Sequence, residues 1–155
     1  MRENRIRSLW ARDEAVVNGW LAIPNSFSAE TMAHAGWDSL TLDMQHGVID
    51  YQSAVAMLTA ISTTQTMPVV RVPWLDPGII MKMLDAGAYA IICPMVSTRA
   101  DAEKLVTAMR YPPQGSRSNG PIRAGVYGEA GGGYLEYWTS WRASASVFTI
   151  GQMTP

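Results

Sequence analysis

The strongest constraint on the fold of this chain is a repeated alternation of strand-like and helix-like segments. Four short apolar segments are each followed, after a loop of a few residues, by a segment with helical character. The predicted strands are 16–23, 39–42, 68–72 and 89–93, and the predicted helices are 29–35, 50–61, 76–84 and 98–110. Such units are typical of a parallel sheet with right-handed crossovers, so the sequence predicts an α/β fold.

Residues that favour helix ends support these boundaries. Ser28, Asp50 and Asp76 stand where three of the predicted helices begin. Gly36 and Gly87 stand where two of them end, in the position that glycine favours after a helix.

The remaining segments extend the pattern. A short helix is predicted at 4–11, and a helix at 134–142 and a strand at 146–152 are expected near the other end. Segment 111–133 contains three prolines and seven glycines, and we expect a functional or interface loop there. About five parallel strands are therefore predicted within a single domain, 1–155.

Composition narrows the classes of partner. Twelve basic and 13 acidic residues give a formal charge of −1 without a basic stripe, which argues against nucleic acid as a partner. The charged N-terminal segment lacks the apolar core of a signal peptide or membrane span. The single cysteine, Cys93, cannot form an internal disulfide and is expected to be buried, so a cytoplasmic location is predicted.

The residues most suited to chemistry follow the second and third predicted strands. Loops after parallel strands open onto one face, so we expect Asp43, His46 and Arg71 to converge there. A neutral imidazole can accept a proton at physiological pH, and Asp43 or Asp85 could raise its basicity. The alternative is that His46 caps the next helix or is hydrogen-bonded in the core.

Arg71 ends an apolar strand, where a buried guanidinium requires an anionic partner. A bound oxo acid would satisfy it, and a structural ion pair with Asp43 or Asp85 is equally compatible with the spacing. The glycine-rich segment 115–120 is either an anion-binding nest or a flexible loop.

Five segments resemble motifs of the HpcH/HpaI aldolase family, in the same order, from about Trp20 to Gly120. They are Gly19-Trp20, Leu42-Asp43-Met44-Gln45-His46-Gly47, Val70-Arg71-Val72-Pro73, Leu84-Asp85-Ala86-Gly87-Ala88 and Tyr111-Pro112-Pro113-Gln114-Gly115-Ser116-Arg117. The resemblance implies a (β/α) barrel of the TIM type. It also implies a class II pyruvate aldolase that cleaves 4-hydroxy-2-oxo acids into pyruvate and an aldehyde.

The resemblance also implies roles for individual residues. His46 matches the general base, and Asp85 matches the acid that raises the basicity of this histidine. Arg71 matches the residue that binds the pyruvate oxo group and stabilises the enolate. Gln152 and Trp20 match substrate-contacting residues, and Asp43 is expected to support the site.

The chain departs from the family pattern where the metal site is expected. The family uses a divalent cation, commonly magnesium, manganese or cobalt, held by a glutamate two residues after the glutamine and by a later aspartate. Thr154 stands near the glutamate position, and the aspartate would lie beyond residue 155. We therefore expect no metal ligands in this chain, an incomplete barrel truncated before its second half, and impaired turnover.

We expect an aldolase that assembles as a homo-oligomer. Two other interpretations of the sequence are possible. One is a non-catalytic open α/β module that binds an oxo acid or a partner chain. The other is a citrate lyase-like or malyl-CoA lyase-like enzyme, which is less compatible with His46 and Arg71.

Overall fold

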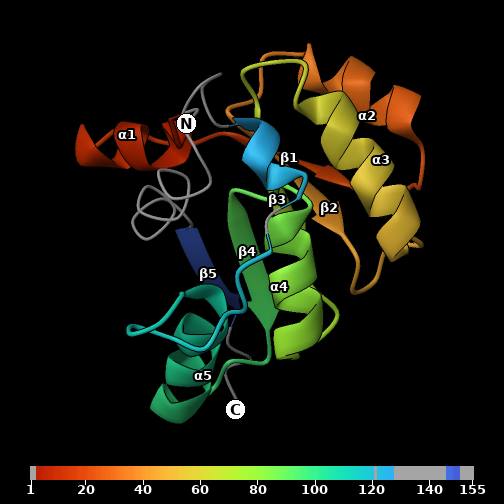
Figure 1. Cartoon of the computed structure of the whole chain (residues 1–155). Helices are drawn as coiled ribbons and strands as arrows, with labels where there is room; N and C mark the ends of the chain where they lie inside the picture. Colours follow the sequence, from red (N-terminus) through yellow and green to blue (C-terminus); the bar gives the residue numbers. More distant parts are fainter. Residues whose placement is uncertain (1–2, 121, 128–145, 151–155) are drawn as a thin grey trace, which may run out of the picture.

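Five parallel strands form one continuous sheet in the computed structural model, which describes residues 3–120, 122–127 and 146–150 (Figure 1). The strands are β1 (Asn18–Leu21), β2 (Ser39–Asp43), β3 (Met67–Arg71), β4 (Ala90–Pro94) and β5 (Ser146–Ile150). Their order in the sheet is their order in the chain, and every neighbouring pair is parallel. The α/β prediction with five strands is confirmed.

Helices precede the sheet and connect its strands. They are α1 (Arg5–Ala11), α2 (Ser26–Ala33), α3 (Tyr51–Ile61), α4 (Pro77–Asp85), α5 (Arg99–Met109) and the 3₁₀ helix η1 (Ala124–Tyr127). The helices α2, α3, α4 and α5 each follow one strand and precede the next, from β1 to β5. Parallel strands need such long connections between them. The predicted helix at 134–142 lies outside the described residues. No helix in the described part is both long and apolar enough to cross a membrane.

Side-chain caps explain where α2, α3, α4 and α5 begin. The side chains of Asp50, Asp76 and Thr98 accept backbone N–H groups at the starts of α3, α4 and α5, so the predicted starts are confirmed. The predicted cap of α2 was wrong. Asn25 is the N-cap, and its Oδ1 accepts the N–H of Ser28 at 2.8 Å. The helix therefore begins three residues earlier than predicted.

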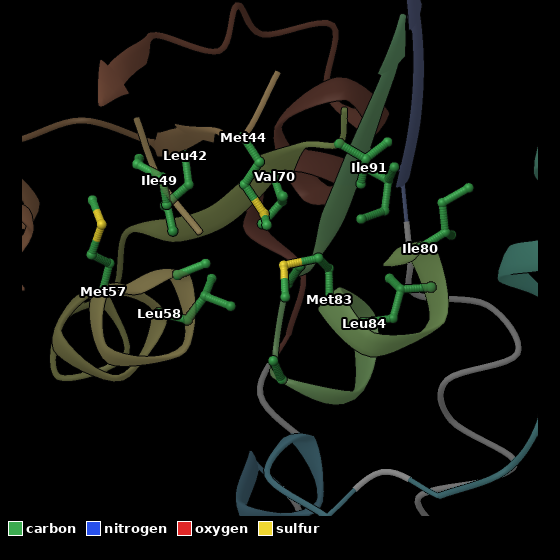
Figure 2. Close-up of a cluster of buried hydrophobic side chains, with 14 of the residues drawn as sticks. Leu42, Met44, Ile49, Met57, Leu58, Val70, Ile80, Met83, Leu84 and Ile91 are labelled. Atoms are coloured by element: carbon green, nitrogen blue, oxygen red, sulfur yellow. The ribbon is translucent and has the colours of Figure 1, made fainter. Parts of the chain in front are cut away.

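The outer face of the sheet is apolar and packs against the helices. Leu42, Val70 and Ile91 point toward α3 and α4, as Figure 2 shows. The helices contribute side chains such as Met57 and Leu84, which are almost completely buried. This layer contains the predicted buried Cys93, and burial raises the pKa of its thiol to about 11.

The inner face carries different side chains because neighbouring residues of a strand point to opposite faces. Asp43 pairs in register with Arg71, and Arg71 pairs with Ile92. Each follows an outer-face residue by one position, so all three lie on the inner face. The strand ends therefore present Asp43 and Arg71 side by side.

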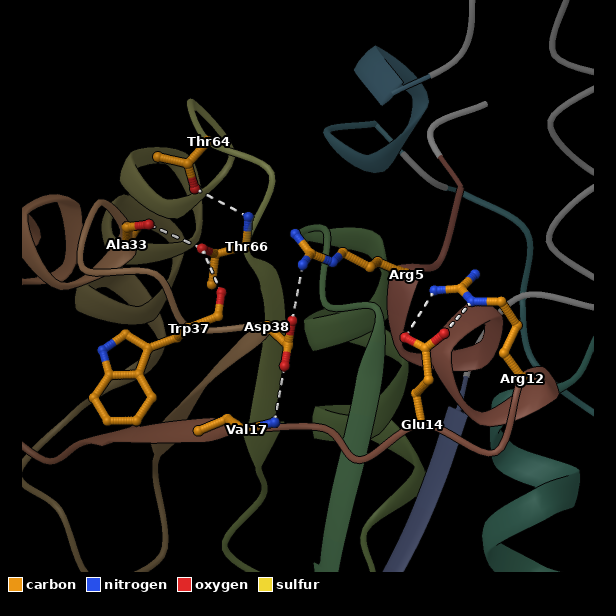
Figure 3. A network of polar contacts seen from close by, with 9 residues as sticks. All are labelled: Arg5, Arg12, Glu14, Val17, Ala33, Trp37, Asp38, Thr64 and Thr66. Carbon is orange, nitrogen blue, oxygen red and sulfur yellow. Dashed lines mark hydrogen bonds and ion pairs between the residues drawn. The ribbon is translucent and has the colours of Figure 1, made fainter.

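Polar contacts fix the opposite end of the strands, where the chain enters β2 and β3 (Figure 3). The Asp38 carboxylate binds the Arg5 guanidinium of α1 at 3.0 Å and accepts the N–H of Val17 at 2.9 Å. Just before β3, the Thr66 hydroxyl contacts the carbonyl oxygens of Ala33 and Trp37 at 2.9 and 3.1 Å. Thr66 thus joins the end of α2 and the turn after it to the start of β3.

Replacing Thr66 by valine should lower the free energy of unfolding by about 1–2 kcal/mol, because the one hydroxyl proton shared by the Ala33 and Trp37 carbonyl oxygens is lost while side-chain volume is nearly kept. Thr66→Ser retains the donor and should stay close to the unmodified protein. Urea denaturation followed by circular dichroism measures both. Equal stability of Thr66→Val and the unmodified chain would contradict the role of this hydroxyl.

Candidate functional site

A bidentate ion pair joins the last residues of β2 and β3. Arg71 Nε donates to Asp43 Oδ1 at 2.8 Å, and Arg71 Nη2 donates to Oδ2 at 2.5 Å. The side chains are 16% and 5% exposed, so the pair is largely shielded from water. The sequence was compatible with an ion pair between Arg71 and either Asp43 or Asp85, and the structure shows the pair with Asp43. The predicted convergence of Asp43 and Arg71 is confirmed.

Trp20 of β1 completes a group of three side chains. Its indole N–H donates to Asp43 Oδ2 at 3.2 Å, and the Arg71 guanidinium lies 4.9 Å from the centre of its ring. A cation above an indole ring is favourable and keeps the guanidinium plane in place. Trp20 remains 44% exposed, so one side of the group is open to a ligand.

Asp43 also organises the loop that follows β2. Its Oδ1 accepts the backbone N–H groups of Gln45 at 3.0 Å and His46 at 3.2 Å. Gly47 lies so close to the Asp43 carbonyl oxygen and the Ala22 backbone that a Cβ there would collide with them. The loop is therefore held tightly against the end of β1.

His46 reaches this site through its backbone, and its side chain is exposed. Asp43 binds the His46 main chain, so it does not orient the imidazole as the sequence suggested. His46 therefore lies in the loop that follows the carboxyl end of β2.

Hydrogen bonding controls the charge of Asp43. Burial alone would raise its pKa, but the hydrogen bonds from Arg71, the His46 N–H, the Trp20 indole and the Gln45 N–H outweigh it. The pKa of Asp43 is therefore held well below its usual range, and the carboxylate stays charged at neutral pH.

Asp85 lies elsewhere in this chain. It is the last residue of α4, before the turn that leads back to the start of β4. Its Oδ1 accepts from Arg117 Nη2 at 2.5 Å, and Arg117 is only 1% exposed and lies 4.6 Å from the centre of the Tyr111 ring. Within the described part of the chain, the expected contact between Asp85 and His46 is not formed. Arg117 is recognisable in the sequence as part of a family motif, but its pairing with Asp85 was not predicted.

The first three residues of the glycine-rich segment after α5 do not form an anion-binding nest. The N–H groups of Gly115, Ser116 and Arg117 donate to carbonyl oxygens of Tyr111, Thr107 and Arg110. These three donors satisfy carbonyl groups at the end of the preceding helix and in the turn after it, so they are not available to an anion. At its first position the segment is closely packed, because a Cβ at Gly115 would collide with the carbonyl oxygens of Thr107 and Arg110, whereas nothing lies within 4 Å of the Cβ position at Gly120.

A metal site is not formed by the described residues alone. Within 3–120, 122–127 and 146–150, no group of three or more His, Cys, Asp or Glu side chains could hold a cation. The expected substrate contact Gln152 and the residue near the glutamate position, Thr154, lie outside the described residues.

Comparisons with known proteins identify the family and the fold. The family model described as HpcH/HpaI aldolase/citrate lyase matches residues 18–146. A hydroxypyruvate/pyruvate aldolase of Rhizorhabdus wittichii is 44% identical over 132 residues, which are 85% of this chain and 52% of that protein. A 4-hydroxy-2-oxo-heptane-1,7-dioate aldolase of Salmonella dublin is 43% identical over 105 residues, 68% of this chain and 40% of that protein. The chain thus spans about half the length of the curated relatives it matches.

A solved structure shows the same architecture. A HpcH/HpaI aldolase/citrate lyase family protein from Burkholderia cenocepacia superposes with a TM-score of 0.83 and 32% sequence identity. The superposition covers 94% of this chain and 58% of that chain. The predicted barrel-type fold is confirmed, with five consecutive parallel strands supplied by the residues described.

The Asp43 charge makes stability depend on pH in a defined direction. Asp43→Asn should lower the free energy of unfolding by about 3 kcal/mol at pH 7, because Arg71 loses its buried partner. The depressed pKa contributes stability above the unfolded-state pKa of about 4, and this contribution disappears as pH falls toward the folded-state pKa. The difference in free energy of unfolding between Asp43→Asn and the unmodified protein should therefore shrink by roughly 1.4 kcal/mol per pH unit below about pH 4.

Asp13→Asn is the matched control, because Asp13 is exposed and asparagine tolerates its positive φ of 58°. Urea denaturation at several pH values measures both variants. A pH-independent difference between Asp43→Asn and the unmodified protein would contradict the assignment.

Proposed function

Because the chain belongs to the HpcH/HpaI aldolase/citrate lyase family, we propose that its strand-end site binds a 2-oxo acid of the pyruvate type. The whole protein would be a carbon–carbon lyase that cleaves 4-hydroxy-2-oxo acids to pyruvate and an aldehyde. The observation that carries this proposal is the Arg71 guanidinium, fixed by Asp43 and Trp20 at the carboxyl ends of the strands. A cytoplasmic location and assembly into homo-oligomers belong to the same proposal.

The names of the relatives support a lyase acting on oxo acids. The family description includes citrate lyases as well as aldolases, so it does not choose between them. The relatives from Rhizorhabdus wittichii and Salmonella dublin are both named as aldolases, of hydroxypyruvate/pyruvate and of 4-hydroxy-2-oxo-heptane-1,7-dioate. Both names fit cleavage next to a 2-oxo acid better than a citrate lyase-like reaction.

Arg71 can bind an oxo acid without breaking its ion pair. A guanidinium has five N–H donors, and Asp43 takes two of them. The remaining donors can approach an oxo group or carboxylate, while Asp43 and Trp20 keep the guanidinium from moving. A donor fixed before the reaction stabilises developing negative charge at little reorganisation cost.

The chemistry then requires a base and a place for the enolate charge. In cleavage, His46 would accept the proton of the C4 hydroxyl group as the C3–C4 bond breaks, which gives the aldehyde and the enolate of pyruvate. The enolate charge lies on the C2 oxygen, toward Arg71, until the protonated His46 returns its proton to C3, and the reverse of this last step is the exchange of pyruvate methyl protons.

The Asp43–Arg71 pair also favours a second candidate, a module that binds an oxo acid or a partner chain without turnover. A guanidinium already neutralised by a carboxylate attracts an anion less strongly than an unpaired one. Binding of pyruvate without proton exchange would distinguish this candidate from an aldolase.

His46→Ala should reduce exchange of the pyruvate methyl protons in deuterium oxide by at least about 100-fold, because the base that forms the enolate is lost. Proton NMR measures the exchange with and without added manganese or magnesium. His34→Ala is the control, since His34 is an exposed histidine at the end of α2. Exchange that persists in His46→Ala would exclude His46 as the base, and folded unmodified protein without exchange would support the binding module.

Arg71→Lys should weaken pyruvate binding by about 10-fold or more, because lysine keeps the charge but loses the planar, bidentate geometry. Arg99→Lys is the control, since the Arg99 side chain is 93% exposed on α5. Isothermal titration calorimetry with pyruvate measures both variants, and circular dichroism checks their folding. Unchanged affinity in folded Arg71→Lys would contradict the proposed contact.

A further inference from the structure

The dipeptide Asn-Gly occurs twice in the chain, at Asn18-Gly19 and at Asn119-Gly120. In such a dipeptide the glycine nitrogen can attack the asparagine side chain, because glycine has no Cβ that hinders the approach. The attack requires rotation of the asparagine backbone about its Cα–C bond, and it requires space around the glycine. Both asparagine side chains are exposed, so the surroundings of the backbone decide which of the two can react.

Asn18-Gly19 is held in the sheet. Both residues belong to β1, where they pair in register with Ser39 and Leu40 of β2. Gly19 is buried, and a Cβ placed on it would lie only 2.6 Å from the Leu40 Cδ2 atom. The Asn18 Oδ1 atom accepts hydrogen bonds from the hydroxyl groups of Ser39 at 2.8 Å and Thr41 at 3.0 Å. Reaction at Asn18 would therefore disrupt both the strand pairing and these two hydrogen bonds.

Asn119-Gly120 forms the end of the glycine-rich segment 115–120, beyond the residues that hydrogen-bond to α5 and the turn after it. Neither residue belongs to a helix or strand, and both are exposed. Apart from its chain neighbours, no described atom lies within 4 Å of the Cβ position at Gly120. The Gly120 carbonyl oxygen accepts the N–H of Ile122 at 2.9 Å, a contact that involves neither of the reacting atoms. The backbone therefore has space for the attack at Asn119 that it lacks at Asn18.

We propose that Asn119 is a site of spontaneous deamidation in the folded protein, and that the sheet protects Asn18 from the same reaction. The Gly120 backbone nitrogen attacks the Asn119 side-chain carbonyl carbon and forms a C–N bond. The side-chain nitrogen leaves as ammonia, with the proton that the Gly120 nitrogen loses, and a cyclic succinimide remains. Water then opens the ring at either carbonyl group, which yields aspartate or isoaspartate at position 119.

The modification changes the charge beside a pocket on the outer side of α4. Gly120 lines this pocket of about 330 Å³ together with Lys82, Asp85 and Arg123. Either product places a carboxylate next to Gly120, where the unmodified chain has a neutral amide. The modified protein therefore carries one more negative charge where the segment after α5 meets α4. Neither oxo-acid binding nor lyase activity is needed for this change.

The test is incubation of the 155-residue chain at mildly alkaline pH, both folded and unfolded in guanidinium chloride. Digestion at acidic pH and tandem mass spectrometry then measure the conversion of amide to acid at each asparagine. In the folded chain Asn18 should react at least about 10-fold more slowly than Asn119, because the strand must open first. In the unfolded chain the two rates should be similar, since both sites are Asn-Gly. Equal rates in the folded chain, or no reaction there at Asn119, would overturn the proposal.

Asn119→Gln is the matched variant, because it keeps a neutral amide while the extra methylene group makes ring closure much slower. Anion-exchange chromatography should show a more acidic form that accumulates in the unmodified chain and is largely absent from Asn119→Gln. Gly120→Ala should slow the reaction several-fold, since its Cβ meets open space in the fold but hinders the attacking nitrogen. Circular dichroism establishes which variants are folded. An acidic form that accumulates equally fast in folded Asn119→Gln would also overturn the proposal.

Discussion

The ion pair between Asp43 and Arg71 is the interaction on which the strand-end site depends. Its two carboxylate oxygens receive the Arg71 guanidinium, the Trp20 indole and the N–H groups of Gln45 and His46. One carboxylate therefore fixes a side chain on each neighbouring strand and the loop after its own. A charge buried in this way is tolerable because donors surround it. The orientation of Arg71 follows from the parallel register of β2 and β3, which places the two residues directly side by side.

Residues that pack the core and residues that form the site are neighbours in each strand but point to opposite faces of the sheet. Leu42 and Val70 point outward into the helix layer, and the next residues, Asp43 and Arg71, point inward. The outer layer can therefore be continuously apolar without affecting the site. The inner face can carry charge at the ends of β2 and β3, because α2 to α5 pack on the opposite face and α1 covers Val69 and Ile92 instead. The same division explains why the polar group around Asn18 lies below the ion pair, on the inner side of β1 and β2.

Features that depend on local chemistry were predictable from the sequence, and features that depend on distant chain segments were not. The starts of α3, α4 and α5 followed from residues that cap their own helices. Asn25 was missed because Ser28, a comparable cap, stands three residues later on the same helix. Asp43 was recognisable as a partner of Arg71, since both end neighbouring strands, but spacing could not choose it over Asp85. The pairing of Asp85 with Arg117 depends on how the loop after α5 returns to α4, and no local pattern encodes that return.

The segment that follows α5 links the ends of α3 and α4. Arg123 donates to the carbonyl oxygens of Leu58, near the end of α3, and Ala86, at the end of α4. Carbonyl groups at helix ends carry partial negative charge, so one guanidinium stabilises both ends at once. Arg117 secures the same loop to Asp85. The carboxylate that family resemblance assigns to catalysis is thus already engaged, within this chain, in holding α4 and the loop together. A catalytic role of Asp85 would therefore use the acceptor sites that Arg117 leaves open on its two carboxylate oxygens.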